Sequence, residues 1–181
     1  MDKAILTVYT REVNPECYPA GLANSVHFSY QSDGEDAIPF HKNYGILFVE
    51  GRISSDNTII PRGVANPKLF VMDNIAYGIC AEVILENGLP DVMCEGKRFL
   101  WTTTDFITFK AEGMVDSAEL EKRSPNTSLQ LDEDIIREAI LYWTPITNTA
   151  VKIPEEITVS SRDEMKNVKA SLLYSDGSVH E

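Results

Sequence analysis

A short phrase that occurs twice constrains the fold of this chain more than any other feature of the sequence. The first copy spans residues 26–34 and reads VHFSYQSDG, and the second spans residues 99–106 and reads FLWTTTDF. Each copy reads as an apolar/polar strand, a turn with Ser or Thr near Asp, and a second strand opened by an aromatic residue. Repeated strand–turn–strand units without helices predict an all-β fold of radial type, and such folds often hold a ligand at their axis.

The spacing of the two copies fits the blades of a β-propeller. The copies are offset by 72 residues, from Asp33 to Asp105. One blade takes roughly 40–50 residues, so inserted loops must account for the rest. We therefore expect about two propeller-like blades, a partial five-bladed propeller, within residues 1–115.

Size and charge narrow the classes of partner. At 181 residues and 43% hydrophobic residues, the chain can build a packed core. The net charge of −12 would repel both nucleic acid and an anionic bilayer, so we expect neither as a partner. A soluble protein with a neutral ligand fits this charge, and acidity that serves solubility alone is an equal alternative.

The cysteines and the acidic residues predict no metal centre. Cys17, Cys80 and Cys94 form neither a disulfide framework nor a Cys-x-x-Cys pair, and Cys80 lies in an apolar run typical of a core. The acidic residues of 112–121 lack the spacing of a calcium loop, and no phosphate-binding glycine loop occurs. We expect no cofactor, and a structural calcium ion stays open.

The opening segment bears on localisation. Its apolar run is too short for a signal peptide or a membrane helix. We expect a secreted or cell-surface location if an upstream signal has been removed from a larger parent protein, and a cytoplasmic location otherwise.

Most of the expected elements are strands. Alternating or continuous apolar runs predict strands at 4–10, 25–31, 44–50, 68–72, 77–83, 98–103 and 106–112. The polar residues 116–134 indicate a linker or a long surface loop. Residues 135–143 have apolar residues at helical spacing, but their strand-forming residues favour a strand at 138–144.

The last 31 residues change character. Residues 151–181 predict two strands joined by a Ser-Asp-Gly turn. Three parts are therefore expected: a propeller-like domain at 1–115, a linker with an additional strand at 116–150, and a separate segment at 151–181.

Residues 4–112 resemble the opening of the five-bladed propellers of glycoside hydrolase family 43. The segments that carry the resemblance read ILTVYT, LANSVHFSY, SDG, NYGILF, GVANPKLF and LWTTTDF. Residues 151–181 are similar to the first part of a bacterial immunoglobulin-like domain through the phrase YSDGS. Such modules often accompany secreted bacterial enzymes that degrade polysaccharides.

The resemblance implies inverting hydrolysis of an arabinose- or xylose-containing polysaccharide. That chemistry needs a carboxylate base and a carboxylic acid roughly 6.5–9.5 Å apart. The family's base is commonly the Asp of an Arg-Asp-Pro phrase, and the matching phrase here is Ala65-Asn66-Pro67. Because an amide cannot accept a proton at neutral pH, no catalytic residue can be named in this chain.

Three residues are the candidate substrate-binding positions, each with a structural alternative. Asn66 could bind a sugar hydroxyl, or simply open a strand after a turn. His27 could line the propeller axis, or be a hydrogen-bonded core histidine. Trp101 could stack on a sugar, or pack in the core.

Asp33, Asp105 and Asp176 are interpreted as turn residues whose carboxylates bind nearby backbone N–H groups.

Three functions therefore stay open from the sequence. The chain is part of a glycosidase, or a non-catalytic module that binds carbohydrate, or a structural piece that supports a neighbour. The expected partners are carbohydrate and the remaining domains of the same polypeptide or a neighbouring chain. Asn66 at the base position favours the non-catalytic alternative.

Overall fold

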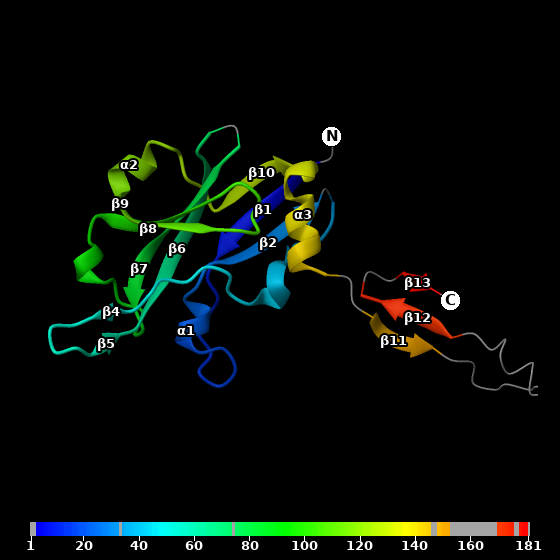
Figure 1. The fold of residues 1–181 in the computed structure, drawn as a ribbon, viewed down its shortest axis with the longest axis horizontal. Helices are drawn as coiled ribbons and strands as arrows, with labels where there is room; N and C mark the ends of the chain where they lie inside the picture. The colour runs from blue at the N-terminus through cyan, green and yellow to red at the C-terminus, as the bar shows by residue number, and fades with distance from the viewer. Residues whose placement is uncertain are drawn as a thin grey trace, which may run out of the picture. The chain divides into compact units, whose positions relative to one another are not determined.

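The chain is predominantly β-structure in a computed structural model that describes residues 3–32, 34–73, 75–145, 148–152, 170–175 and 178–180 (Figure 1). All of the pairings between its described strands are antiparallel, which confirms the expected all-β class. The contacts divide the chain into two units, Met1–Thr144 and Pro145–Glu181. Each unit is described by itself below.

The first sheet of unit 1 joins strands from both ends of that unit. Its order is β10-β1-β2-β3, with the strands at Lys3–Tyr9 (β1), His27–Ser32 (β2), Ile38–Pro39 (β3) and Ser128–Asp132 (β10). In β1 the side chains of Ala4, Leu6 and Val8 are buried in alternation. This period of two places one face of the strand on the core, as the sequence pattern predicted.

The second sheet is a meander of four consecutive strands. It contains β6 (Arg62–Val71), β7 (Tyr77–Leu85), β8 (Lys97–Thr103) and β9 (Lys110–Asp116), paired in that order. Almost every residue of β7 is buried, because core side chains cover both of its faces. The predicted hairpin across residues 73–74 is confirmed, although β6 begins six residues earlier than expected.

The main core lies where the two sheets meet, since β1 and β10 both contact β6. Its largest fully buried side chains include Leu6, Phe28, Val64, Leu69, Ile79 and Phe106. A smaller core on the other face of the second sheet contains Phe70, Cys80, Leu100 and Leu120. Cys80 is therefore a core residue, as its apolar run indicated.

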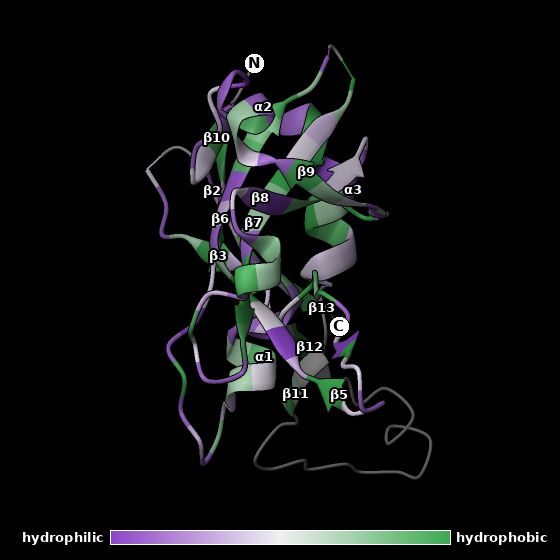
Figure 2. Ribbon diagram, turned by 90° about the vertical axis from the view of Figure 1, so that its left-hand side faces the viewer, coloured by the Kyte–Doolittle hydropathy of each residue, from purple (hydrophilic) through white to green (hydrophobic). Residues whose placement is uncertain are grey.

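Residues 133–143 form a helix, so the predicted strand at 138–144 is wrong. Helix α3 spans Glu133–Trp143 and buries Ile136 and Ala139. Hydrophobic and hydrophilic bands alternate along α3 in Figure 2. Two acidic residues in the first turn interact favourably with the positive end of the helix dipole. The helical spacing of the apolar residues outweighs their strand propensity.

Residues 116–134 hold regular elements where the sequence indicated a linker or a long surface loop. Asp116 caps helix α2 (Ser117–Glu121), its carboxylate accepting from the backbone N–H of Ala118 at 3.2 Å. Leu120 of α2 is buried in the smaller core. Strand β10 follows and pairs with β1 over five residues. The two buried leucines, Leu120 and Leu131, and the pairing with β1 thus anchor a largely polar segment.

The predicted strand at residues 44–50 is also wrong. Leu47 alone forms an isolated bridge, to Val26, through backbone hydrogen bonds of 2.9 Å and 3.3 Å. Gly45, Leu47 and Val49 are buried in alternation, so the period of two is real. The pattern reflects packing against the main core, since the segment joins no described sheet. Beyond it, β4 (Arg52–Ile53) and β5 (Ile59–Ile60) form a short hairpin.

The predicted hairpin of β8 and β9 is confirmed, but its second strand begins four residues later than expected. Phe106 lies in the turn with a positive φ of 55° and a fully buried ring. The Asp105 carboxylate accepts from the N–H groups of Ile107 and Thr108, both at 2.8 Å. Partial burial would raise the pKa of Asp105, but hydrogen bonds from Thr108, Ile107 and Thr103 outweigh it and lower the pKa to about 2. The interpretation of Asp105 as a turn residue is confirmed, while Asp33 and Asp176 lie outside the described residues.

Unit 2 contains a small antiparallel sheet. Its strands are β11 (Asn148–Lys152), β12 (Ser171–Tyr174) and β13 (Val179–His180), in that order. The Asp176-Gly177 part of the predicted turn lies outside the described residues. The expected immunoglobulin-like character of this segment stays a prediction.

Candidate functional site

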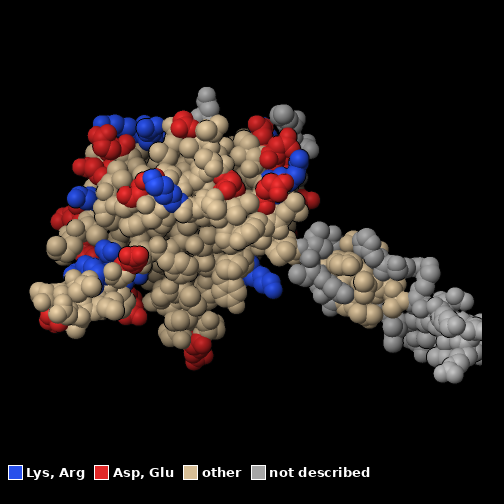
Figure 3. Space-filling model, in the orientation of Figure 1, with Lys and Arg blue, Asp and Glu red and all other residues tan. Residues whose placement is uncertain are grey.

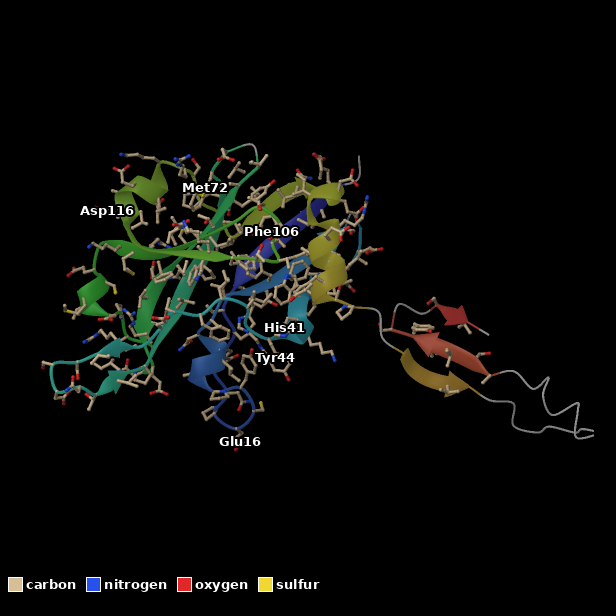
Figure 4. All side chains as sticks on the ribbon, in the orientation of Figure 1. Glu16, His41, Tyr44, Met72, Phe106 and Asp116 are labelled. Atoms are coloured by element: carbon tan, nitrogen blue, oxygen red, sulfur yellow. The ribbon has the colours of Figure 1, made fainter. Side chains whose placement is uncertain are left out.

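Aromatic and polar side chains from four segments meet where β1 ends and β2 begins. We call this group the aromatic–polar cluster: Tyr9, Arg11, Tyr18, His27, His41, Asn43 and Tyr44. Strands β1 and β2 carry some of these residues, and a loop and a tight turn carry the others. Figure 4 shows His41 and Tyr44 close together beside the lower ends of these strands.

His27 is the buried centre of the cluster. Its Nδ1 lies 3.0 Å from the carbonyl oxygen of Ser25, and its Nε2 lies 2.9 Å from the hydroxyl of Tyr18. A carbonyl can only accept, so Nδ1 carries the proton and the Nε2 of the neutral ring accepts from Tyr18. Burial lowers the pKa of His27, and the charge of Arg11 lowers it further against the opposing effect of the Ser25 carbonyl. The ring is therefore held neutral and in one tautomer.

Arg11 and Tyr9 hold the turn that completes the cluster. The Arg11 guanidinium lies 3.8 Å above the centre of the Tyr18 ring, a cation–π contact. Its Nη1 donates to the carbonyl oxygen of Asn43 at 3.2 Å. The Tyr9 hydroxyl donates to the Asn43 side-chain oxygen at 2.8 Å. Asn43 is thus bound through its backbone and its side chain.

The turn has an uncommon backbone conformation. His41, Lys42 and Asn43 have positive φ values of 50°, 53° and 64° in succession. Residues other than glycine adopt this region at a cost, and such strain tends to occur at functional sites. The fully buried Phe40 anchors the start of the turn, and the bonds from Tyr9 and Arg11 anchor its end.

The turn presents two rings to solvent. The Tyr44 side chain is 51% exposed, and its ring centre lies 5.8 Å from that of His41 and 6.3 Å from that of Tyr18. The His41 ring in turn lies 5.5 Å from Trp143 at the end of α3. The loop of residues 11–18 forms an open cavity of about 710 Å³, and Arg11 and Tyr18 of the cluster help to line it. The arrangement offers an aromatic surface next to hydrogen-bonding groups.

The structure separates the three sequence-predicted binding residues into different surroundings. His27 belongs to the cluster, but it is fully buried and bonds to the Tyr18 hydroxyl. Trp101 is 3% exposed and packs against Phe99, with ring centres 4.6 Å apart, which agrees with the core alternative. Its ring face is not open to a sugar.

Asn66 belongs to a separate polar network on the second sheet. It is exposed, with φ of 50°, at an irregularity in the pairing of β6 with β7. Its amide donates to Glu82 at 2.8 Å, and its carbonyl accepts from Arg98 at 3.2 Å. Arg98 also pairs with Glu82 at 2.9 Å. The amide is thus engaged by protein groups, and its predicted role toward a sugar stays a prediction.

No family model matches the chain, and no curated protein or solved structure is significantly similar to it. The family inferred from the sequence therefore stays a prediction.

Two further searches concern the described residues alone. Within them, no helix has the length and apolar character needed to cross a membrane. Within the same residues, no three His, Cys, Asp or Glu side chains group closely enough to hold a metal ion.

Sequence reasoning missed most of the cluster. Arg11, Tyr18, Asn43 and Tyr44 come from segments that have the composition of loops, and only the folded chain brings them together. The one local signal is Asn43, because asparagine tolerates the left-handed region better than most residues. Nothing in the sequence marks His41 and Lys42 for the same conformation.

Proposed function

We propose that this chain is a non-catalytic module that binds carbohydrate through the aromatic–polar cluster. The observation that carries the proposal is the half-exposed ring of Tyr44, which lies between two other rings and directly follows the anchored Asn43. A rigid aromatic surface beside a few fixed polar groups is typical of small-molecule sites.

The chemistry of the cluster fits a sugar. A pyranose has an apolar face of C–H groups that packs on an aromatic ring, and hydroxyls around its edge that need donors and acceptors. Tyr44 and His41 offer ring surface, while Arg11 and the Tyr9–Asn43 pair offer polar groups. Because the strained turn is already tied to β1, little ordering is needed when a ligand binds.

The two sheets support a propeller-like architecture for this module. We propose that each four-stranded sheet corresponds to one blade, since propeller blades are four-stranded antiparallel sheets arranged about an axis. The consecutive order of β6 to β9 fits one blade, and the contact of the edge strand β10 with the edge strand β6 fits two neighbouring inner strands. Completion of a ring would need further blades.

Hydrolysis rests on the sequence resemblance alone. It needs a pair of carboxyl groups around one sugar bond, and the family's base position holds Asn66. The hydrolase function therefore stays a hypothesis. Incubation with nitrophenyl arabinosides and xylosides tests it directly, and turnover above background would overturn the non-catalytic assignment.

Calorimetric titration with xylo- and arabino-oligosaccharides tests binding. The Tyr44→Ala variant loses the ring face and is expected to bind at least about tenfold more weakly, which corresponds to about 1.4 kcal/mol. Tyr44→Phe keeps the ring and should bind within about threefold of the parent chain, because a hydroxyl contact is a small part of the interaction.

The matched control is Ile75→Ala, which removes a 72% exposed side chain from the β6–β7 turn. This variant should bind as the parent chain does. Equal affinity of the Tyr44→Ala variant and the parent chain would overturn the proposal that this surface is the sugar site.

A further inference from the structure

Two cations stand at the aromatic–polar cluster in a strongly acidic chain. The net charge is −12, yet the cluster contains Arg11, and Lys42 lies between its members His41 and Asn43. Among the described residues, the ion pairs involve other lysines and arginines, and neither Arg11 nor Lys42 takes part. No carboxylate of the described residues therefore lies within ion-pair distance of either side chain.

Arg11 is held with part of its donor set unused. Stacking on Tyr18 fixes the plane of the guanidinium, and Nη1 donates to Asn43. Within the described residues, the Nε and Nη2 groups have no hydrogen-bond acceptor. A fixed guanidinium with two free donor groups matches the two oxygens of a carboxylate. Burial raises the pKa of Tyr9 and the charge of Arg11 opposes that rise, while burial lowers the pKa of His27 and the charge of Arg11 adds to that fall, so the charge acts on the cluster.

Lys42 directly precedes the residue that binds Arg11. Its neighbour in sequence, Asn43, is the residue whose carbonyl accepts from Arg11. The left-handed backbone of Lys42, with φ of 53°, is part of the turn that presents Tyr44. The Lys42 side chain is exposed, and it has no hydrogen-bond partner within the part of the chain that the structure describes.

Two acidic residues, Glu12 and Glu16, belong to the loop that lines the cavity with Arg11, while many of the other charged residues lie elsewhere. In Figure 3, Lys, Arg, Asp and Glu side chains lie mainly along the upper and left margins of unit 1. Glu16 belongs to the loop that lines the cavity, but it lies at the tip of that loop, away from His41 and Tyr44 (Figure 4). An anionic ligand at Tyr44 would thus lie away from the Glu16 carboxylate, and among the described residues neither Glu12 nor Glu16 forms an ion pair with Arg11 or Lys42.

We propose that the cluster selects a carbohydrate that carries a carboxylate, a uronic acid residue, whose charged group pairs with Arg11 and Lys42 while its ring packs on Tyr44. This inference rests on the proposed carbohydrate-binding function and names its ligand class. The neutral ligand expected from the overall charge is replaced by an acidic one, because the local charge at the site is opposite to that of the whole chain.

The test compares matched pairs of oligosaccharides by calorimetric titration of the full chain. One pair is a glucuronic acid-substituted xylo-oligosaccharide and its carboxyl-reduced form, and the other is a galacturonic acid trimer and its carboxyl-reduced form. At low salt, at least one acid should bind about tenfold or more tightly than its reduced form, and salt should weaken only the acid.

Variants assign the effect to the two cations. Lys42→Gln alters an exposed side chain and should reduce the preference for the acid at least about threefold, and Arg11→Gln should abolish it. Lys97→Gln, a change at another exposed cation outside the cluster, should leave it unchanged. If Arg11→Gln disturbs the fold, as its contact with Tyr18 allows, Lys42→Gln still decides the question.

The outcomes separate the two proposals. Equal binding of both members of each pair would overturn the uronic acid inference and leave the carbohydrate-binding function standing. A preference for the acid that survives in the Lys42→Gln variant would overturn the assignment to this turn. No binding of either member of either pair would overturn both the inference and the function on which it rests.

Discussion

His27 shows how one buried ring links the fold to the site. The residue is fully buried, and its two nitrogens are bound to Ser25 and Tyr18. The neutral form satisfies both bonds, whereas a proton on Nε2 would force the Tyr18 hydroxyl to turn toward another acceptor. The carbonyl of Asn43 lies 3.3 Å from that hydroxyl and offers such an acceptor. Protonation of His27 would therefore change a hydrogen bond to the strained turn.

The lowered pKa of His27 predicts a pH dependence of stability. The unfolded chain binds the proton at the ordinary pKa of 6.5, and the folded chain binds it only at lower pH. The contribution of His27 to the free energy of unfolding is thus fully present above about pH 6.5. It falls as the pH drops below that value, by at most about 1.4 kcal/mol per pH unit. Urea unfolding between pH 5.5 and 8 measures this slope.

The variants of this experiment separate His27 from the exposed His41. His27→Gln should flatten the slope, whatever its effect on absolute stability, while His41→Gln should preserve it. An unchanged slope in the His27→Gln variant would mean that other groups cause the pH dependence.

At the scale of elements, Gly78 shows how closely β6 and β7 pack. Gly78 lies opposite Phe70 in the ladder, and an added Cβ would lie 2.2 Å from the Phe70 ring. We expect Gly78→Ala to destabilise the chain by about 1–3 kcal/mol, because the ring must move within a packed core. Gly21 of helix α1 (Ala20–Ala23) has no atom within 4 Å of the same position, so Gly21→Ala should be neutral or gain up to about 1 kcal/mol. Chemical denaturation of both variants tests the contrast, and equal losses would contradict it.

The elements that the sequence predicted are those in which pattern and pairing coincide. Strand β1 alternates and β7 is buried over most of its length, and both are present, as are the two hairpins of the second sheet. Residues 44–50 have the same pattern and fail, because burial alone does not provide a partner strand. Helix α3 was missed because its isoleucines and aromatic residues favour a strand locally, while Ile136 and Ala139 must share one buried face.

The site was less predictable than the fold. Its groups meet through contacts between residues far apart in sequence, such as Tyr9 with Asn43 and Arg11 with Tyr18. The positive φ angles of His41 and Lys42 are imposed by tertiary contacts. Asn66 and Trp101 were chosen for chemistry that a strand position can use in other ways, as the Asn66–Glu82 bond and the burial of Trp101 demonstrate.

At the scale of the whole molecule, unit 1 has a core that ends before its last residue. The residues of the main core lie between Ala4 and Ala139, with Trp143 packed against them. A chain that stops at Thr144 should therefore keep its fold and the cluster. We expect its thermal midpoint to change by less than about 4 °C, equivalent to roughly 1 kcal/mol or less at this size. Calorimetry of the shortened and full chains measures this, and a larger drop would show that residues 145–181 stabilise unit 1.

Strand β10 has a consequence for the order in which the chain can acquire its fold. The first sheet pairs Thr7 with Ser128, and their hydroxyls lie 3.0 Å apart across a sequence separation of 121 residues. At roughly 5–20 residues per second of synthesis, one edge of β1 stays unpaired for on the order of 6–24 s until β10 has been made. During that interval the nascent chain carries an open edge able to join a foreign strand, and a chaperone that shields such edges would matter most at that stage.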